Sequence, residues 1–132
     1  MNNKIFYWSP FIDKVATTKS VINSCYSLKK YSQNFKPVIL NACGEWNSLS
    51  DEINQKGISL ENLTSLKILE NKPSQKGFVK SRLLYIYMLI QLYMPLLNFL
   101  KKNKDNFIII HLLTSLPLIL NIFLKNKKMI LR

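Results

Sequence analysis

FIIIHLLTSLPLILNIFL, residues 107–124, contains no charged residue, and two different folds follow from the two ways in which it can pack. As one rod, 18 uncharged and mostly apolar residues are long enough to span a membrane as a helix. As two pieces, the β-branched run 107–110 forms a buried strand, and a helix begins near Pro117, which suits a first turn. His111, Thr114 and Asn121 are costly in lipid, so the sequence favours the second structure.

A membrane hairpin is the main alternative. Residues 83–100 are also uncharged, and Lys101, Lys102 and Lys104 between the two runs would form a positive-inside loop. In an intermediate arrangement, the helix over 79–102 is part core and part interfacial, and it docks the domain on an anionic membrane surface.

The rest of the chain alternates short apolar runs with segments of helical spacing, which predicts an α/β protein. Continuous apolar strands separated by helices are typical of a parallel sheet covered on both faces, and right-handed crossovers make it a doubly wound, Rossmann-like sheet. At 132 residues we expect one domain. Strands are predicted at 5–8, 37–40, 66–69, 107–110 and 129–131, and helices at 15–31, 48–56, 79–102 and 114–125.

Charge is distributed unevenly along the chain. The net charge is +12, and residues 71–132 hold eleven Lys or Arg against one carboxylate, Asp105. This excess predicts an anionic partner, either a phosphorylated ligand, a nucleic acid or the inner leaflet of a membrane. The chain has no recognised nucleic-acid-binding motif, so we expect no nucleic acid. The apolar run 5–8 is too short for a signal peptide, which favours a cytoplasmic protein.

The sequence shows no catalytic constellation, no Gly-rich phosphate loop and no metal-ligand spacing, so we expect neither a metal nor a cofactor. Cys25 and Cys43 are expected to be free thiols. If the strand order is 3-2-1-4-5, a ligand crevice lies between the first and fourth strands, where residues 8–11 and 110–112 face each other. Helices that begin near Thr17 and Ser115 would present backbone N–H groups to an anion there.

Three side chains at the carboxyl edge of the predicted sheet each have two interpretations. His111 is either a buried histidine satisfied by backbone groups or a contact to an acceptor or phosphate. Lys80 and Arg82 are either a solvated basic helix start or a site for an anionic acceptor.

Three segments carry a resemblance to a known family: YWSPFIDKVATTKSVINSCYSLKKY (7–31), GFVKSR (77–82), and the part from HLLTSLPLIL through MILR (111–132). They resemble the amino-terminal domain of family-4-type glycosyltransferases, which have the GT-B architecture of two Rossmann-like domains facing a cleft. The resemblance covers essentially the whole chain through patterns of position. Many relatives carry a Gly-Gly pair where this chain has Ser9-Pro10-Phe11.

The resemblance implies the acceptor-binding half of a retaining enzyme of polysaccharide biosynthesis, which transfers a sugar from a nucleotide-sugar donor to a glycan or lipid-linked acceptor. Residues 1–132 would be an N-terminal domain incomplete at its C-terminal end, and the donor-binding domain would be missing. We therefore expect the chain alone to be inactive, and cytoplasmic or peripheral on the inner face of the membrane. The implied cleft and donor-diphosphate residues are Ser9, Pro10, Phe11, Thr17 and Thr18, and the implied acceptor-side residues are His111, Thr114, Ser115, Lys80 and Arg82.

Overall fold

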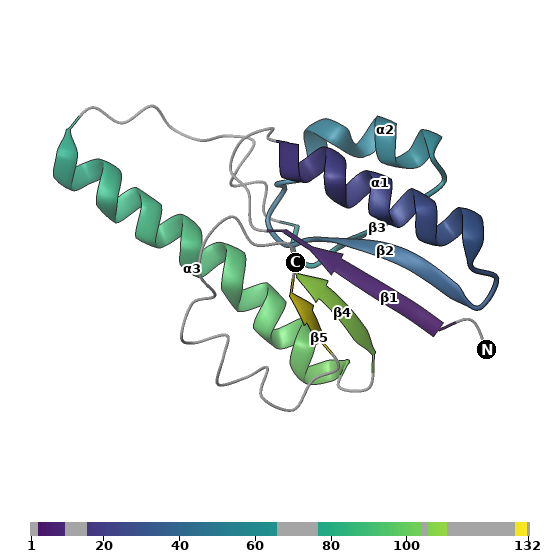
Figure 1. Ribbon diagram of the computed structural model, residues 1–132. Helices are drawn as coiled ribbons and strands as arrows, with labels where there is room; N and C mark the ends of the chain where they lie inside the picture. Colours follow the sequence, from purple (N-terminus) through teal and green to yellow (C-terminus); the bar gives the residue numbers. More distant parts are fainter. Residues whose placement is uncertain (1–2, 10–15, 66–76, 104–105, 111–128, 132) are drawn as a thin grey trace.

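The computed structural model describes residues 3–9, 16–65, 77–103, 106–110 and 129–131, and these form a five-stranded parallel sheet (Figure 1). The strand order is β3-β2-β1-β4-β5, the order on which the expected crevice depends, and every neighbouring pair is parallel. The strands are β1 (Asn3–Trp8), β2 (Phe35–Asn41), β3 (Ser59–Asn62), β4 (Phe107–Ile110) and β5 (Met129–Leu131).

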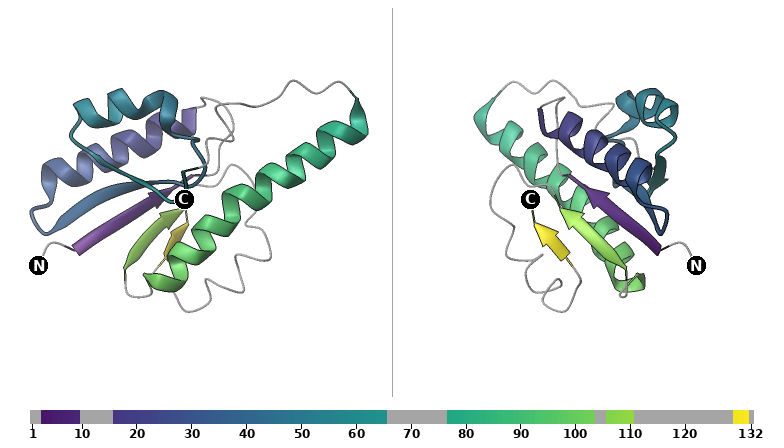
Figure 2. Two further views of the ribbon diagram at one scale, coloured as in Figure 1. Left: turned by 180° about the vertical axis from the view of Figure 1, so that it is seen from behind. Right: turned by 45° about the vertical axis from the view of Figure 1, so that its right-hand side comes forward.

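Helices lie on both faces of this sheet. The helices α1 and α2 pack on one face and α3 packs on the other (Figures 1 and 2). Their positions match the predicted helical segments over 15–31, 48–56 and 79–102, with the second one divided between a 3₁₀ turn and an α-helix. The bounds are α1 (Ala16–Tyr31), η1 (Asn47–Leu49), α2 (Ser50–Gln55) and α3 (Phe78–Lys102).

Two hydrophobic cores form because successive side chains of a strand point to opposite faces of the sheet. Tyr7 and Ile39 face α1 and α2, where they join Val21, Ile22 and Cys25 of α1. Their neighbours in the strands face α3. The core on that side includes Phe6, Trp8, Val38, Leu40, Leu92, Leu96, Leu100, Ile108 and Ile110.

The strand at Phe107–Ile110 decides between the two folds that the sequence allows for residues 107–124. Its residues pair with β1 through Ile5↔Phe107 and with β5 through Ile108↔Met129. These four residues therefore cannot belong to a membrane-spanning helix, and the predicted strand is confirmed, with Ile108 and Ile110 buried. The helix predicted over 114–125 lies outside the described residues.

The third strand is not where the sequence placed it. The sheet's third strand is Ser59–Asn62, whereas the predicted run 66–69 lies outside the described residues. The segment Ser-Leu-Glu-Asn has little apolar character because β3 is an edge strand, paired only with β2, and only Leu60 packs on a core. Before it, Gly57 ends the α2 segment with a φ of 60°, a left-handed conformation that favours glycine.

α3 is the one described helix that is long and apolar enough to cross a membrane. It continues through Pro95 as a single element of 25 residues. One side of its C-terminal half packs on the sheet. Phe99 meets Phe6 edge-on with ring centroids 4.8 Å apart, and Tyr93 meets Trp8 at 5.4 Å. This half of the helix is therefore part of the protein core.

Candidate functional site

Buried polar side chains gather at one edge of the sheet. Among the described residues, four polar or charged side chains are buried: Ser9, Thr18, Asn41 and Glu45. Ser9 directly follows β1, Asn41 ends β2, Glu45 lies in the turn after β2, and Thr18 lies in the first turn of α1. All four therefore lie at the carboxyl edge of a parallel sheet, which is where such sheets bind ligands.

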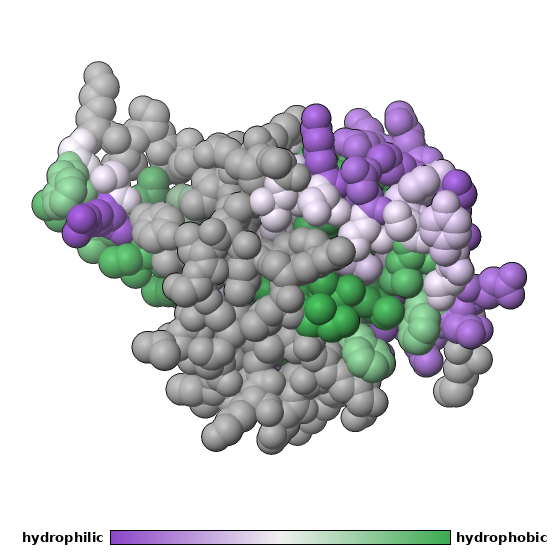
Figure 3. Space-filling view, viewed as in Figure 1, coloured by the Kyte–Doolittle hydropathy of each residue, from purple (hydrophilic) through white to green (hydrophobic). Residues whose placement is uncertain are grey.

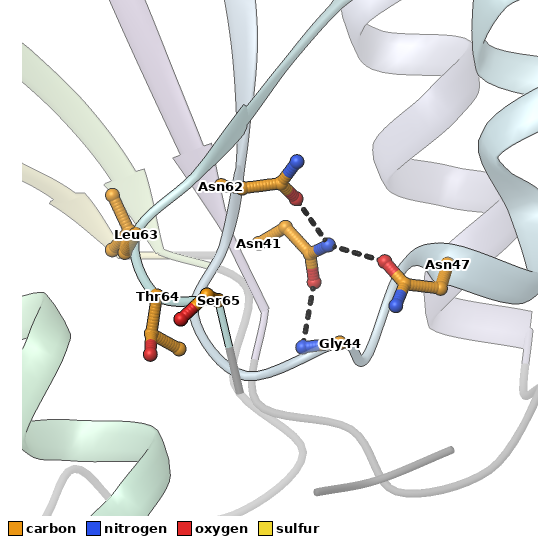
Figure 4. Close-up of a pocket in the computed structure, with 7 residues that line it drawn as sticks. All are labelled: Asn41, Gly44, Asn47, Asn62, Leu63, Thr64 and Ser65. Carbon is orange, nitrogen blue, oxygen red and sulfur yellow. Dashed lines mark hydrogen bonds between the residues drawn. The ribbon is translucent and has the colours of Figure 1, made fainter. Parts of the chain in front are cut away.

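Asn41 is the centre of a hydrogen-bond network at this edge (Figure 4). Its Nδ2 donates to Oδ1 of Asn47 and to Oδ1 of Asn62, at 2.7 Å each. Its Oδ1 accepts from the backbone N–H groups of Gly44 and Trp46, at 3.1 Å each. The buried amide thus uses its full hydrogen-bonding capacity, and it fixes two further amides and the turn after β2.

The buried carboxylate of Glu45 stabilises the same turn after β2. Its carboxylate oxygens accept the backbone N–H groups of Ala42 at 2.6 Å and Cys43 at 2.7 Å. Burial raises the pKa of Glu45 above its ordinary value, while these two N–H groups favour the charged form. Since both oxygens are committed to backbone groups, Glu45 acts as a structural clamp for the turn.

The network borders an open pocket of about 540 Å³, which we call the asparagine pocket (Figure 4). Its walls come from the ends of β2 and β3, the turn after β2 and the segment after β3. None of its lining side chains carries a charge. The lining residues are Asn41, Gly44, Asn47, Asn62, Leu63, Thr64 and Ser65.

A second hollow, of about 510 Å³, lies between the end of β3 and α3. It shares Asn62, Leu63 and Thr64 with the asparagine pocket, so the two hollows adjoin. Its α3 wall includes Met94 and Phe99. A ligand seated among the asparagines could therefore extend along α3, over a surface that also includes the charged side chains of Glu61 and Lys102.

At the neighbouring ends of β1 and β4, two polar atoms have no hydrogen-bond partner among the described residues. They are Oγ of Ser9 and Nε1 of Trp8, and both side chains are fully buried. Leaving a buried donor unpaired costs roughly 1–3 kcal/mol, and such groups in native proteins call for an explanation. A ligand or water that reached the carboxyl end of β1 would supply the missing partner for Ser9.

The predicted site residues fall into three groups. Ser9 and Thr18 are buried at the carboxyl edge, and Thr17 is partly buried beside them. Lys80 and Arg82 are exposed on the first turns of α3, where the Arg82 guanidinium lies 4.2 Å from the ring centroid of Phe78; neither lines the asparagine pocket. The remaining five lie outside the described residues: Pro10, Phe11, His111, Thr114 and Ser115.

Sequence reasoning missed the three asparagines. None of Asn41, Asn47 and Asn62 is among the predicted site residues. The available signal was a polar residue directly after a buried apolar run, since Asn41 follows 38–40 in the same way that Ser9 follows the first strand. In a parallel sheet this position marks the ligand-binding edge.

Both cysteines are free and buried, as predicted. Burial raises the pKa of the Cys25 thiol. The pKa of the Cys43 thiol is raised to about 12, mainly by burial and also by the nearby charge of Glu45 and the hydrogen bond with it. At pH 8 the thiolate fraction of Cys43 is then lower than in an unfolded chain by roughly a thousandfold. We expect neither thiol to react with a thiol-specific reagent in the native protein, and both to react in denaturant. Rapid modification of either cysteine without denaturant would contradict this.

Among the described residues, no group of three or more His, Cys, Asp or Glu side chains could hold a metal ion. Comparison of the chain with protein-family models, with curated proteins and with solved structures gave no match.

Proposed function

We propose that this chain is the acceptor-side domain of a glycosyltransferase and that it binds an uncharged sugar unit of the acceptor in the asparagine pocket. The observation that carries the proposal is a pocket lined by amides and hydroxyls, without a charged side chain, at the carboxyl edge of a parallel sheet. In this proposal the sheet is a doubly wound, Rossmann-like domain and forms one half of a GT-B enzyme.

The polar groups of the pocket suit sugar hydroxyls. Asn47 and Asn62 each use Oδ1 to accept from Asn41, and no described residue accepts a hydrogen bond from their Nδ2 groups. These Nδ2 groups can donate to sugar oxygens, while the hydroxyl of Ser65 can donate or accept. Leu63 adds an apolar contact for the C–H face of a sugar ring. A charged ligand would find no opposite charge among the lining residues.

The donor would lie on the other side of the same edge. The donor would approach the first turn of α1, with Thr17 and Thr18, and the hydroxyl of Ser9, which has no hydrogen-bond partner among the described residues. A second domain would hold that donor, and we expect the chain without such a domain to transfer no sugar. The acceptor is a glycan or a lipid-linked sugar.

Titration of the ¹⁵N-labelled chain with a panel of methyl glycosides, followed by NMR, tests this proposal. We expect at least one glycoside to shift the side-chain amide signals of Asn47 and Asn62. The double variant Asn47→Ala, Asn62→Ala should weaken that binding by roughly 10- to 30-fold, because two hydrogen bonds of about 1 kcal/mol each are lost.

Asn23→Ala is the matched control, because Asn23 is an exposed asparagine of α1 outside the pocket. It should leave the affinity unchanged. If no glycoside shifts the pocket amides, or if Asn23→Ala weakens binding as much as the double variant, the asparagine pocket is not a sugar site.

A further inference from the structure

α3 carries an exposed apolar surface on the side that faces away from the sheet. The exposed residues are spaced three, four or one apart, so they share one face of the helix over about four turns. We call this surface the α3 stripe. It consists of Val79, Leu83, Ile86, Tyr87, Ile90 and Met94, which are between 50% and 68% exposed. Met94, at one end of the stripe, also borders the hollow between β3 and α3.

The stripe lies on a part of α3 that extends away from the rest of the domain. Figures 1 and 2 show the N-terminal half of the helix projecting past the ends of the strands, and Figure 3 shows apolar and hydrophilic surface together at its tip. Single exposed apolar side chains are ordinary, but a continuous row of six on a projecting helix marks a surface that binds something apolar.

The charges of α3 have one sign. Lys80 and Arg82 lie in its first turns, Lys101 and Lys102 lie in its last, and the helix contains no Asp or Glu. The apolar stripe is thus bounded at both ends by cations. A helix with an apolar face and basic flanks lies in the interface of an anionic membrane, with the apolar side chains at the boundary between headgroups and acyl chains.

We infer that the α3 stripe docks this protein on the surface of an anionic lipid bilayer. This inference rests on α3 alone and does not depend on the proposed sugar site.

The helix lies on the bilayer and does not cross it, because its opposite face belongs to the core. Leu92, Leu96 and Leu100 are buried against the sheet, and Phe99 packs edge-on against Phe6. Insertion across the bilayer would remove these contacts and expose the apolar side of β1, β2 and β4.

A second copy of the chain fits the stripe less well than a bilayer does. Two copies of α3 packed stripe to stripe would bring Lys80 and Arg82 of one copy near basic ends of the other, and α3 offers no carboxylate to compensate. The net charge of +12 adds to this repulsion. An anionic bilayer supplies both the apolar phase and the opposite charge.

The test is co-sedimentation of the full chain with vesicles of phosphatidylcholine alone and of phosphatidylcholine mixed with phosphatidylglycerol. We expect binding to the mixed vesicles only. Lys80→Gln with Arg82→Gln should weaken it by roughly 25-fold, since each basic side chain at an anionic surface contributes roughly fivefold. Ile86→Ser with Ile90→Ser should weaken it by tenfold or more, on the order expected for two buried aliphatic side chains.

Two matched controls lie on α1, which packs on the other face of the sheet. Lys19→Gln with Lys30→Gln removes two exposed charges, and Tyr26→Ser with Tyr31→Ser removes two exposed rings. Both should bind mixed vesicles within about twofold of the parent protein, because surface charges and rings away from the bilayer contribute little. Circular dichroism verifies that each variant is folded.

The inference is overturned if the chain binds neither vesicle, if it binds both equally, or if the α3 variants bind as tightly as the α1 controls. It is also overturned if sedimentation velocity shows a dimer that Ile86→Ser with Ile90→Ser dissociates while vesicle binding is absent. The variant Tyr87→Trp reports directly whether the α3 stripe contacts the bilayer. Its fluorescence should shift to shorter wavelength on mixed vesicles. An unchanged spectrum on vesicles that bind the protein would show that another surface makes the contact.

Discussion

Asn41→Leu should lower the free energy of unfolding by about 3 kcal/mol, because it leaves hydrogen-bonding groups at the carboxyl edge without partners. Leucine has nearly the shape of asparagine, so it excludes water from the same space. The N–H groups of Gly44 and Trp46 lose the oxygen that they share, and Asn47 and Asn62 lose the donor between them. An unpaired buried backbone group costs roughly 1–3 kcal/mol.

Urea denaturation followed by circular dichroism measures this effect. Asn23→Leu makes the same chemical change at an exposed position of α1 and should alter stability by less than about 0.5 kcal/mol. If Asn41→Leu costs no more than this control, the amide network does not hold the turn after β2.

Trp8→Ala should be the most destabilising single substitution in the core that faces α3, with a loss of about 4 kcal/mol. The Trp8 side chain is fully buried, pairs with Ile110 in the register of β1 and β4, and meets the ring of Tyr93 edge-on. Removing the indole leaves a cavity between the centre of the sheet and α3, and neighbouring side chains fixed in strands can close it only in part.

Trp8→Phe is the control for the size of the side chain. It keeps an aromatic ring in the core and removes the indole N–H that has no partner among the described residues, so it should cost less than about 1.5 kcal/mol. Guanidinium unfolding curves of the three proteins give the comparison. A loss for Trp8→Ala no larger than that for Trp8→Phe would mean that the indole is not packed as described.

Hydrophobic runs carried most of the information about the fold. Four strands were recognisable because each contains an uninterrupted apolar run, at 5–8, 37–40, 107–110 and 129–131, which is typical of strands in a parallel sheet. β3 was missed because an edge strand needs few apolar residues, and Ser59, Glu61 and Asn62 resemble a loop. Only one residue of β3, Leu60, packs on the core, so the sequence shows no hydrophobic periodicity that would identify this strand.

The sequence placed a ligand crevice between the first and fourth strands, whereas the asparagine pocket lies at the ends of β2 and β3 on the same edge of the sheet, and its main residues were not recognised. Ser9 was identified because it follows the first strand. The three asparagines come together only through the register that places Asn41 beside Asn62 and through the turn that returns Asn47 to the end of β2. Positions 41, 47 and 62 have no relation in a linear pattern, so their contact depends on the folded sheet.

The central position of β1 also has a consequence for how the chain acquires its structure. One side of β1 pairs with β2 soon after both are made, but Ile5 must wait for Phe107 on the other side. During synthesis the open edge of β1 therefore stays available to foreign strands until residues 107–110 have emerged. Closing so long a loop makes this pairing slow, while its entropic cost rises only with the logarithm of loop length. The yield of native protein would then depend on how fast β1 pairs with β4 compared with a competing strand, and less on the free energy of unfolding of the native state.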